Sequence, residues 1–465
     1  MKLTTTVASV ALPDFGSEKA CPPLPPAVLC ARMERVRACM RQRRLEFLAV
    51  YADREHCANL AYLTGFDPRF EEAVLLMSAE GRCKLLVGNE CQGYLPDVRA
   101  LGLEVELFQE FSLLGQPRGS SKPLKKILRA FGMGLRPRVG AVGWKYFDGS
   151  LLPTRALDVP AYLADVLREI CGAPRRVVNA AGIFMNPRDG LRVTNEPEQI
   201  AQFEYAAGVS SAGVLALLRH LREGVREDAL EKYLDSRGLP LSCHRMVSFG
   251  EKAKRGLASP SANRARLGGA FTTALGVAGS LTCRAGVVAR SAADLPEETR
   301  EFYPRLAANY FDVVATWYEH LGIGALAGDI FQAVSRARKR ALYDFAVNPG
   351  HYIHLDEWLH SPFAAGSTIA LGSGMALQMD IIPVSKGPFC CINAEDGVAL
   401  ADEPLRAALQ RAYPALWRRV LARRAFMREV LGVRLDDSVL PLSHIPGWLP
   451  PYALDLGRVF VRMGA

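Results

Sequence analysis

The chain has 465 residues, of which 49% are hydrophobic and 23% charged, and its formal net charge is +9. These values suit two to four packed domains and exclude long disorder, a collagen-like repeat and a disulfide scaffold. Because the basic runs fall on segments with amphipathic helical spacing, we expect no nucleic-acid partner. No run approaches the roughly 20 uninterrupted apolar residues that a bilayer requires, so we expect no membrane association.

The 11 cysteines are scattered along the chain, and Cys390 and Cys391 are the only close pair. No two cysteines have the CxxC spacing, which argues against a cysteine zinc site. Scattered thiols in a long chain are typical of a reducing compartment, so we expect a cytoplasmic protein.

The first part of the chain predicts a leader followed by an α/β domain. Residues 1–26 lack a dense apolar core and end in a proline-rich stretch, so we expect a flexible leader and not a signal peptide. Apolar side chains at helical spacing predict a helix over residues 31–45, and the apolar run 47–51 predicts a buried strand. We place the N-terminal α/β domain at residues 27–185.

A second domain follows at residues 190–432. Thr194 can cap a helix whose first turn contains Pro197, and the apolar pattern predicts that this helix extends to about residue 221. Helical segments and glycine-rich strands then alternate. Residues 433–465 contain four prolines and are expected to form a C-terminal extension.

Seven segments carry a joint pattern, and they are residues 32–51, 59–65, 194–200, Phe249-Gly250, Gly350-His351, 374–383 and 395–398. In this order they resemble the creatinase, prolidase and aminopeptidase P family, which has the "pita-bread" metallopeptidase fold. The resemblance implies an α/β N-terminal domain. It also implies an α+β C-terminal domain, in which pseudo-twofold helices wrap a curved antiparallel sheet. It further implies a homodimer that binds a small-molecule or peptide-like ligand.

Family enzymes hold two divalent metals with two aspartates, one histidine and two glutamates, and a further histidine handles a proton. In this chain the first aspartate position falls on Ala274 and the second on Leu281 or Ala285, depending on the alignment. The proton-handling histidine falls on Leu257, and no Asp or Glu occurs between residues 251 and 294. Apolar side chains offer no lone pair to a hard cation, so we expect no dinuclear centre.

The other ligand positions are filled. His351 matches the metal histidine, Asp380 stands at the first glutamate position, and Glu395 matches the last. These three side chains could hold one divalent metal, or they could form a hydrogen-bonded network without metal. The second option has a family precedent, because creatinase cleaves an amidic bond without metal. His360 is the candidate for the family's second histidine and joins the candidate catalytic set.

Further residues are candidates for substrate binding. Arg284 is a candidate clamp for a substrate carboxylate, because guanidinium groups pair bidentately with carboxylates; the alternative is a core salt bridge to Asp380 or Glu395. His354 and Tyr352 are candidates to contact the ligand. His444 and Trp448, in the C-terminal extension, are candidates to fold over the mouth of the site.

Three functions remain open. The favoured one is a divergent, hydrolase-like enzyme that acts on a small amino-acid-derived or amidic substrate with one metal or none. The second is a catalytically inactive binding protein that uses the same pocket. The third, a metal-dependent Xaa-Pro aminopeptidase or dipeptidase, is opposed by the missing carboxylates.

Overall fold

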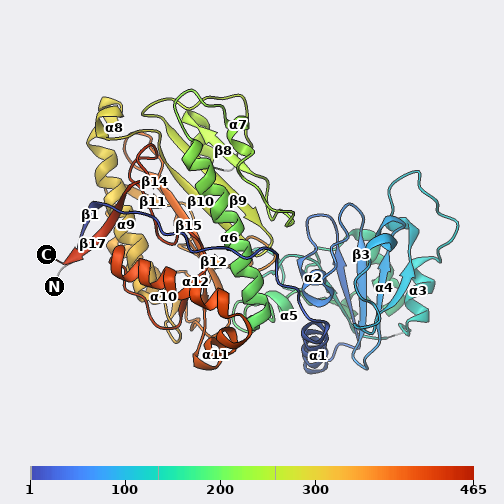
Figure 1. Cartoon of the computed structure of the whole chain (residues 1–465). Helices are drawn as coiled ribbons and strands as arrows, with labels where there is room; N and C mark the ends of the chain where they lie inside the picture. The colour runs from blue at the N-terminus through green and yellow to red at the C-terminus, as the bar shows by residue number, and fades with distance from the viewer. Residues whose placement is uncertain (1–2, 135, 257, 465) are drawn as a thin grey trace. The chain divides into compact units, whose positions relative to one another are not determined.

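The computed structural model describes residues 3–134, 136–256 and 258–464, and the chain forms two compact units (Figure 1). The N-terminal unit comprises Leu24–Val193. The C-terminal unit combines Met1–Pro23 with Thr194–Ala465. The α/β class expected for the first unit and the α+β class expected for the second are both confirmed.

The N-terminal unit contains a six-stranded mixed sheet with strand order β5-β4-β3-β2-β6-β7. Its strands are β2 Phe47–Ala52, β3 Ala73–Ser78, β4 Cys83–Val87, β5 Glu104–Leu107, β6 Val139–Val142 and β7 Val177–Asn179. Its helices are α1 Pro26–Gln42, α2 Ala58–Thr64, α3 Leu124–Ala130, α4 Ala161–Cys171 and α5 Gly182–Met185. Apolar side chains of α3 and α4 pack on one face of this sheet. The predicted first helix and the strand after it correspond to α1 and β2.

The C-terminal unit is built on a seven-stranded antiparallel sheet in which β12-β13-β15-β10-β9-β8 follow one another and β16 also pairs with β15. Its strands are β8 Met246–Phe249, β9 Ala270–Val277, β10 Ser280–Val287, β12 His351–Tyr352, β13 Ala376–Asp380, β15 Asn393–Leu400 and β16 Val439–Pro441. A short second sheet pairs β11 Tyr343–Phe345 with β14 Pro383–Ser385. The helices are α6 Pro197–His220, α7 Glu227–Glu231, α8 Glu297–Arg300, α9 Phe302–His320, α10 Ala327–Ala337, α11 Glu403–Ala412 and α12 Pro414–Ala425.

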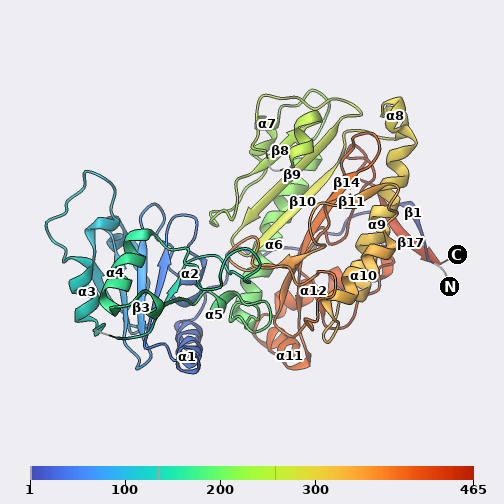
Figure 2. The same cartoon turned by 180° about the vertical axis from the view of Figure 1, so that it is seen from behind.

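Helix α6 covers one face of this sheet. It lies in front of β10 in Figure 1, and β9 and β10 lie in front of it in Figure 2. The hydroxyl oxygens of Ser210 on α6 and Thr282 on β10 are 2.9 Å apart. Among the described residues α6 alone is long and apolar enough to cross a membrane, but 72% of its apolar window is buried inside the protein, as in a core helix.

The flexible leader predicted for residues 1–26 is wrong in its described part. Strand β1 (Leu3–Ser9) pairs antiparallel with β17 (Arg458–Gly464), from Leu3 opposite Gly464 to Ser9 opposite Arg458. Farther along, the Arg419 guanidinium donates to Glu18 Oε1 at 2.8 Å. The C-terminal extension expected at 433–465 packs within this unit, because β16 joins the main sheet and β17 pairs with β1.

The β1–β17 pair gives a first prediction. Deleting residues 1–9 removes the ladder partner of β17, so its amides should exchange hydrogen faster. Amides of β10, in the main sheet, serve as the internal control and should keep their protection. Hydrogen exchange measured by mass spectrometry checks this, and unchanged protection of β17 would contradict the described pairing.

Candidate functional site

Three adjacent strands bring His351, Asp380 and Glu395 together. His351 on β12 lies opposite Gln378 on β13, and Asp380 on β13 lies opposite Glu395 on β15. Side chains two residues apart on a strand share a face, so Gln378 and Asp380 point to the same side. One potential ligand atom from each of His351, Asp380 and Glu395 lies within 4.8 Å of the others, and all three residues are buried. We call these three residues the triad.

The imidazole of His351 is oriented for its Nε2 to act as a ligand. Its Nδ1 lies 3.1 Å from the carbonyl oxygen of Tyr352, which can only accept, so the proton belongs on Nδ1 and the lone pair on Nε2. The Trp358 ring stacks on this imidazole with centroids 4.1 Å apart. Within the described residues, His351 Nε2 and Asp380 Oδ1 are buried without a hydrogen-bond partner. Two buried polar atoms of this kind indicate a place for a further group.

Glu357 is a member of the cluster that the sequence analysis missed. Its Oε1 lies 3.5 Å from His351 Nε2, at nearly the same distance as Glu395 Oε1, which lies 3.6 Å from that nitrogen. The sequence analysis considered only the histidines of this segment, His354 and His360, as site candidates. The usable signal was an acidic pair, Asp356-Glu357, close to His351 in the sequence.

The carboxyl groups of this cluster are hard to ionise without a cation. Burial raises the pKa of Asp380 to about 7, and burial together with the charges of Asp380 and Asp356 raises that of Glu357 to about 7. Burial and the neighbouring Asp380 carry the pKa of Glu395 well above its usual range. Burial lowers the pKa of His351 to about 4. No Lys or Arg in the described part of the chain pairs with these carboxyl groups.

The residues present do not fit a dinuclear metal centre. Ala274 on β9 lies opposite Cys283 on β10, which lies opposite Glu395. The aspartate positions therefore face an apolar cluster, in which Met246, Ala274 and Leu281 are buried and Cys283 packs beside them. The alternative position, Ala285, is also buried. Leu257, at the proton-handling position, lies outside the described residues.

The residues do fit a single divalent cation. The triad offers one imidazole nitrogen and two carboxylates, a donor set that suits manganese, iron, cobalt or zinc. Gln378 orients the Glu395 carboxylate, because its amide nitrogen donates to Oε1 at 3.2 Å and to the Leu281 carbonyl at 2.6 Å. This outer contact is of the kind that positions ligands in metal sites.

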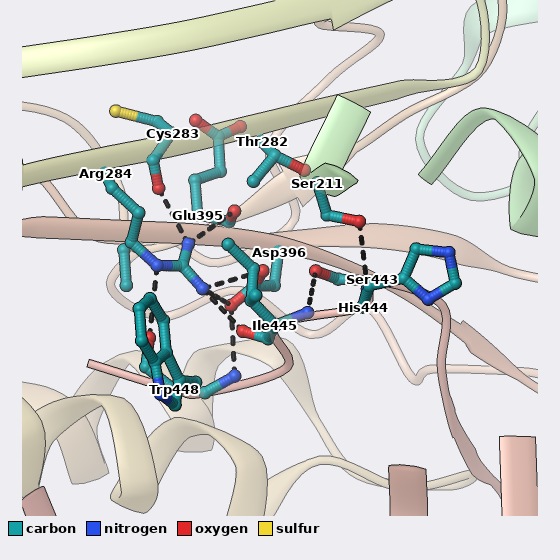
Figure 3. Close-up of polar contacts among 12 residues, drawn as sticks. Ser211, Thr282, Cys283, Arg284, Glu395, Asp396, Ser443, His444, Ile445 and Trp448 are labelled. Atoms are coloured by element: carbon teal, nitrogen blue, oxygen red, sulfur yellow. Dashed lines mark hydrogen bonds and ion pairs between the residues drawn. The ribbon is translucent and has the colours of Figure 1, made fainter. Parts of the chain in front are cut away.

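The expected place of Arg284 beside the triad is wrong. Arg284 and Asp396 each follow a residue of the site face in their strands, so alternation turns them to the opposite face. Figure 3 shows Cys283 and Glu395 on one side of the strands and Arg284 on the other. The Arg284 guanidinium donates to Asp396 Oδ2 at 2.8 Å and to the carbonyl oxygens of Ile445 and Trp448 at 2.6 and 3.2 Å. It is therefore the core salt bridge of the alternative interpretation, with Asp396 as its partner.

The two tail residues also lie away from the mouth of a site. The His444 amide donates to Ser211 Oγ of α6 at 2.9 Å, and its Nδ1 lies 3.2 Å from the Arg423 guanidinium. Trp448 is 1% exposed, and its carbonyl accepts from Arg284. The expectation that these residues cover the site is wrong, because the segment is held on the helix-covered face (Figure 3).

The remaining candidates lie around the triad in other directions. Tyr352 alternates away from His351, and its hydroxyl lies 3.8 Å from the Met375 sulfur. His360 pairs with Tyr352 across an antiparallel bridge, which puts both side chains on the same side. The ring of His354 packs edge-on against Phe203 of α6 at 5.3 Å. The structure thus gathers the triad but directs these three side chains elsewhere.

Solved structures with a similar fold are prolidases and related peptidases, although no family model and no curated protein sequence matches the chain. The prolidase from Pyrococcus horikoshii OT3 is 15% identical, with 80% of this chain and 95% of that chain covered at a TM-score of 0.60. The Xaa-Pro dipeptidase from Bacillus anthracis is 15% identical, with 81% and 96% covered at 0.59. The X-Pro aminopeptidase from Thermotoga maritima MSB8 is 14% identical, with 80% and 95% covered at 0.58.

The chain therefore has the pita-bread fold of the creatinase, prolidase and aminopeptidase P family. The resemblance found in the sequence is confirmed at the level of the fold. Identities of this size carry no activity across, because one fold supports many functions.

The ion pair on the helix-covered face yields a stability prediction. Arg284→Met should lower the free energy of unfolding by about 3–5 kcal/mol, because it leaves Asp396 buried without its partner. The exposed Arg305 of α9 offers a matched control, since Arg305→Met should change stability by less than about 0.5 kcal/mol. Urea unfolding measures both. Full stability of Arg284→Met with loss of ligand binding would restore the clamp role.

The carboxyl cluster yields a pH prediction. Because the pKa values of Asp380 and Glu357 are raised, their contribution to stability is present at low pH and is lost as the pH rises through about 7. The lowered pKa of His351 acts in the opposite sense, with stability lost as the pH falls towards about 4. A cation needs all these groups deprotonated, so Mn²⁺ should raise the melting temperature more at about pH 8 than at about pH 5. Asp380→Asn should remove the Mn²⁺ effect, and an equal shift at both pH values would contradict the account.

Proposed function

We propose that the protein is a hydrolase-like enzyme that cleaves an amidic bond in a small amino-acid-derived substrate at the triad His351, Asp380 and Glu395, with one divalent cation or none. One observation carries the proposal: three buried acid and base groups converge, and two of their atoms lack a hydrogen-bond partner within the described chain. Polar groups with shifted pKa values in an apolar setting are typical of catalytic sites.

The side chains of the site have distinct capacities. His351 Nε2, Asp380 and Glu395 would hold a cation, which would act as a Lewis acid and lower the pKa of a bound water. Asp380, with a pKa of about 7, can release or take up a proton near neutral pH. Gln378 keeps Glu395 in one orientation, and the Tyr352 carbonyl keeps the Nε2 lone pair of His351 available.

A catalytically inactive binding protein is the second candidate. The apolar cluster around Met246, Ala274 and Leu281 favours it, because these buried side chains contribute packing and no catalytic group at the aspartate positions. The same cluster opposes the third candidate, a dinuclear Xaa-Pro peptidase.

The proposal also includes a cytoplasmic homodimer. All 11 cysteines are free thiols, which supports a reducing compartment. A homodimer is proposed because closed twofold assemblies are common among soluble oligomers.

Activity can be tested with a panel of amino-acid amides and short peptides, including Xaa-Pro dipeptides, with and without Mn²⁺. We expect turnover of an amidic substrate that falls by about 10²-fold or more in His351→Ala and Asp380→Asn, with both variants still folded. Xaa-Pro peptides should be poor substrates. Robust proline release that chelators abolish would favour the third candidate, and saturable binding without turnover would favour the second.

A further inference from the structure

We infer that Glu357 is a ligand of the cation site and replaces, from a loop, the carboxylates that β9 and β10 lack. The inference rests on the cation-binding form of the proposed function. Its first support is position: the Glu357 Oε1 atom and the Glu395 Oε1 atom lie at 3.5 and 3.6 Å from the same nitrogen, His351 Nε2. That nitrogen is fully buried and has no hydrogen-bond partner among the described residues.

The loop that carries Glu357 is closed at its base and held at its tip. The Tyr352 amide donates to the His360 carbonyl at 2.7 Å, and the Leu359 amide donates to the Tyr352 carbonyl at 3.1 Å. Next to Glu357, the indole of Trp358 stacks on the imidazole of His351 at an interplanar angle of 20°. These contacts fix the loop tip over the triad, so the loop itself holds Glu357 close to His351.

The direction of the Glu357 side chain needs a physical reason. Its side chain is 28% exposed, so water was available to its carboxylate. The carboxylate instead lies within electrostatic reach of two buried acids, Asp380 and Glu395, and no Lys or Arg in the described part of the chain pairs with it. Turning a carboxylate towards other carboxylates is unfavourable unless a proton or a cation joins them. The role of a cation ligand accounts both for this arrangement and for the buried Nε2 of His351.

The position of Glu357 also compensates for the carboxylates that the resemblance would place on β9 and β10. In place of carboxylates on β9 and β10, the sheet has the apolar cluster that contains Ala274 and Leu281. One imidazole and three carboxylates form a sufficient donor set for one divalent cation. Glu357 is the most exposed of the four side chains, which makes it the first contact for a cation that enters from solvent.

The test is a calorimetric titration of the full chain with Mn²⁺ and, in parallel, with Co²⁺. We expect about one equivalent to bind the wild type, binding weakened about 10- to 100-fold in Glu357→Gln, and no binding in Asp380→Asn. Glu357→Asp should keep part of the affinity. Glu298→Gln, which neutralises an exposed glutamate of α8, is the matched control and should bind like the wild type.

Trp358 provides a second readout that does not depend on activity. Because its ring lies against His351, Co²⁺ should quench its fluorescence in the wild type, and Trp358→Phe should remove that quenching. The quenching should require higher Co²⁺ concentrations in Glu357→Gln. This variant removes one acid from the cluster, so its melting temperature without metal should equal or exceed that of the wild type.

The outcomes separate the two proposals. Wild-type affinity in Glu357→Gln, with binding lost in Asp380→Asn, would overturn the role of Glu357 and leave the cation site in place. No binding of either cation to the wild type would overturn both the role of Glu357 and the cation-binding form of the proposed function.

Discussion

Strand β15 places two neighbouring carboxyl groups, Glu395 and Asp396, on opposite faces of one sheet. The two carboxyl groups have partners of different charge. Asp396 meets the guanidinium of Arg284, and this buried ion pair also holds the carbonyl groups of Ile445 and Trp448. Glu395 meets Asp380, Glu357 and an imidazole that burial keeps neutral. The neutralised face is the helix-covered core. The other face, on which no Lys or Arg among the described residues pairs with the carboxyl groups, is the candidate site.

This contrast defines what kind of centre the protein can form. The chain has the pita-bread fold, but the β9–β10 hairpin contributes apolar packing at the positions where the family resemblance would place carboxylates. A single cation, bound between strands and a loop, is consistent with the donors that remain. The proposed chemistry then depends on one cation or on acid–base groups alone.

Much of the fold and the core of the site could be predicted from the sequence. Each motif alone is weak, but their order along the whole chain identifies the fold. That order predicted that His351, Asp380 and Glu395 belong to one site, and the strand register brings one potential ligand atom of each within 4.8 Å of the others. The face to which a strand residue points is harder to predict, because it changes with every residue. A shift of one residue along β10 separates Cys283 on the site face from Arg284 on the other, and the sequence prediction chose the wrong face for Arg284.

The remaining errors concern contacts between distant segments or within loops. The threonine-rich run Leu3–Ser9 was predicted as a leader because its partner strand, Arg458–Gly464, lies at the other end of the chain. No pattern in either segment alone indicates that they pair. Glu357 lies in a loop whose closure depends on the bridge between Tyr352 and His360. Its position near His351 follows from that closure, which no motif of the family records.

The central claim is that the triad forms a site for one cation on a sheet that has lost the second. Anomalous diffraction from crystals of the full chain grown with Mn²⁺ tests it most directly. The account predicts a single anomalous peak within bonding distance of His351 Nε2, Asp380 and Glu395. Two peaks bridged by the carboxylates, or no peak at the triad when the cation is in excess, would contradict it.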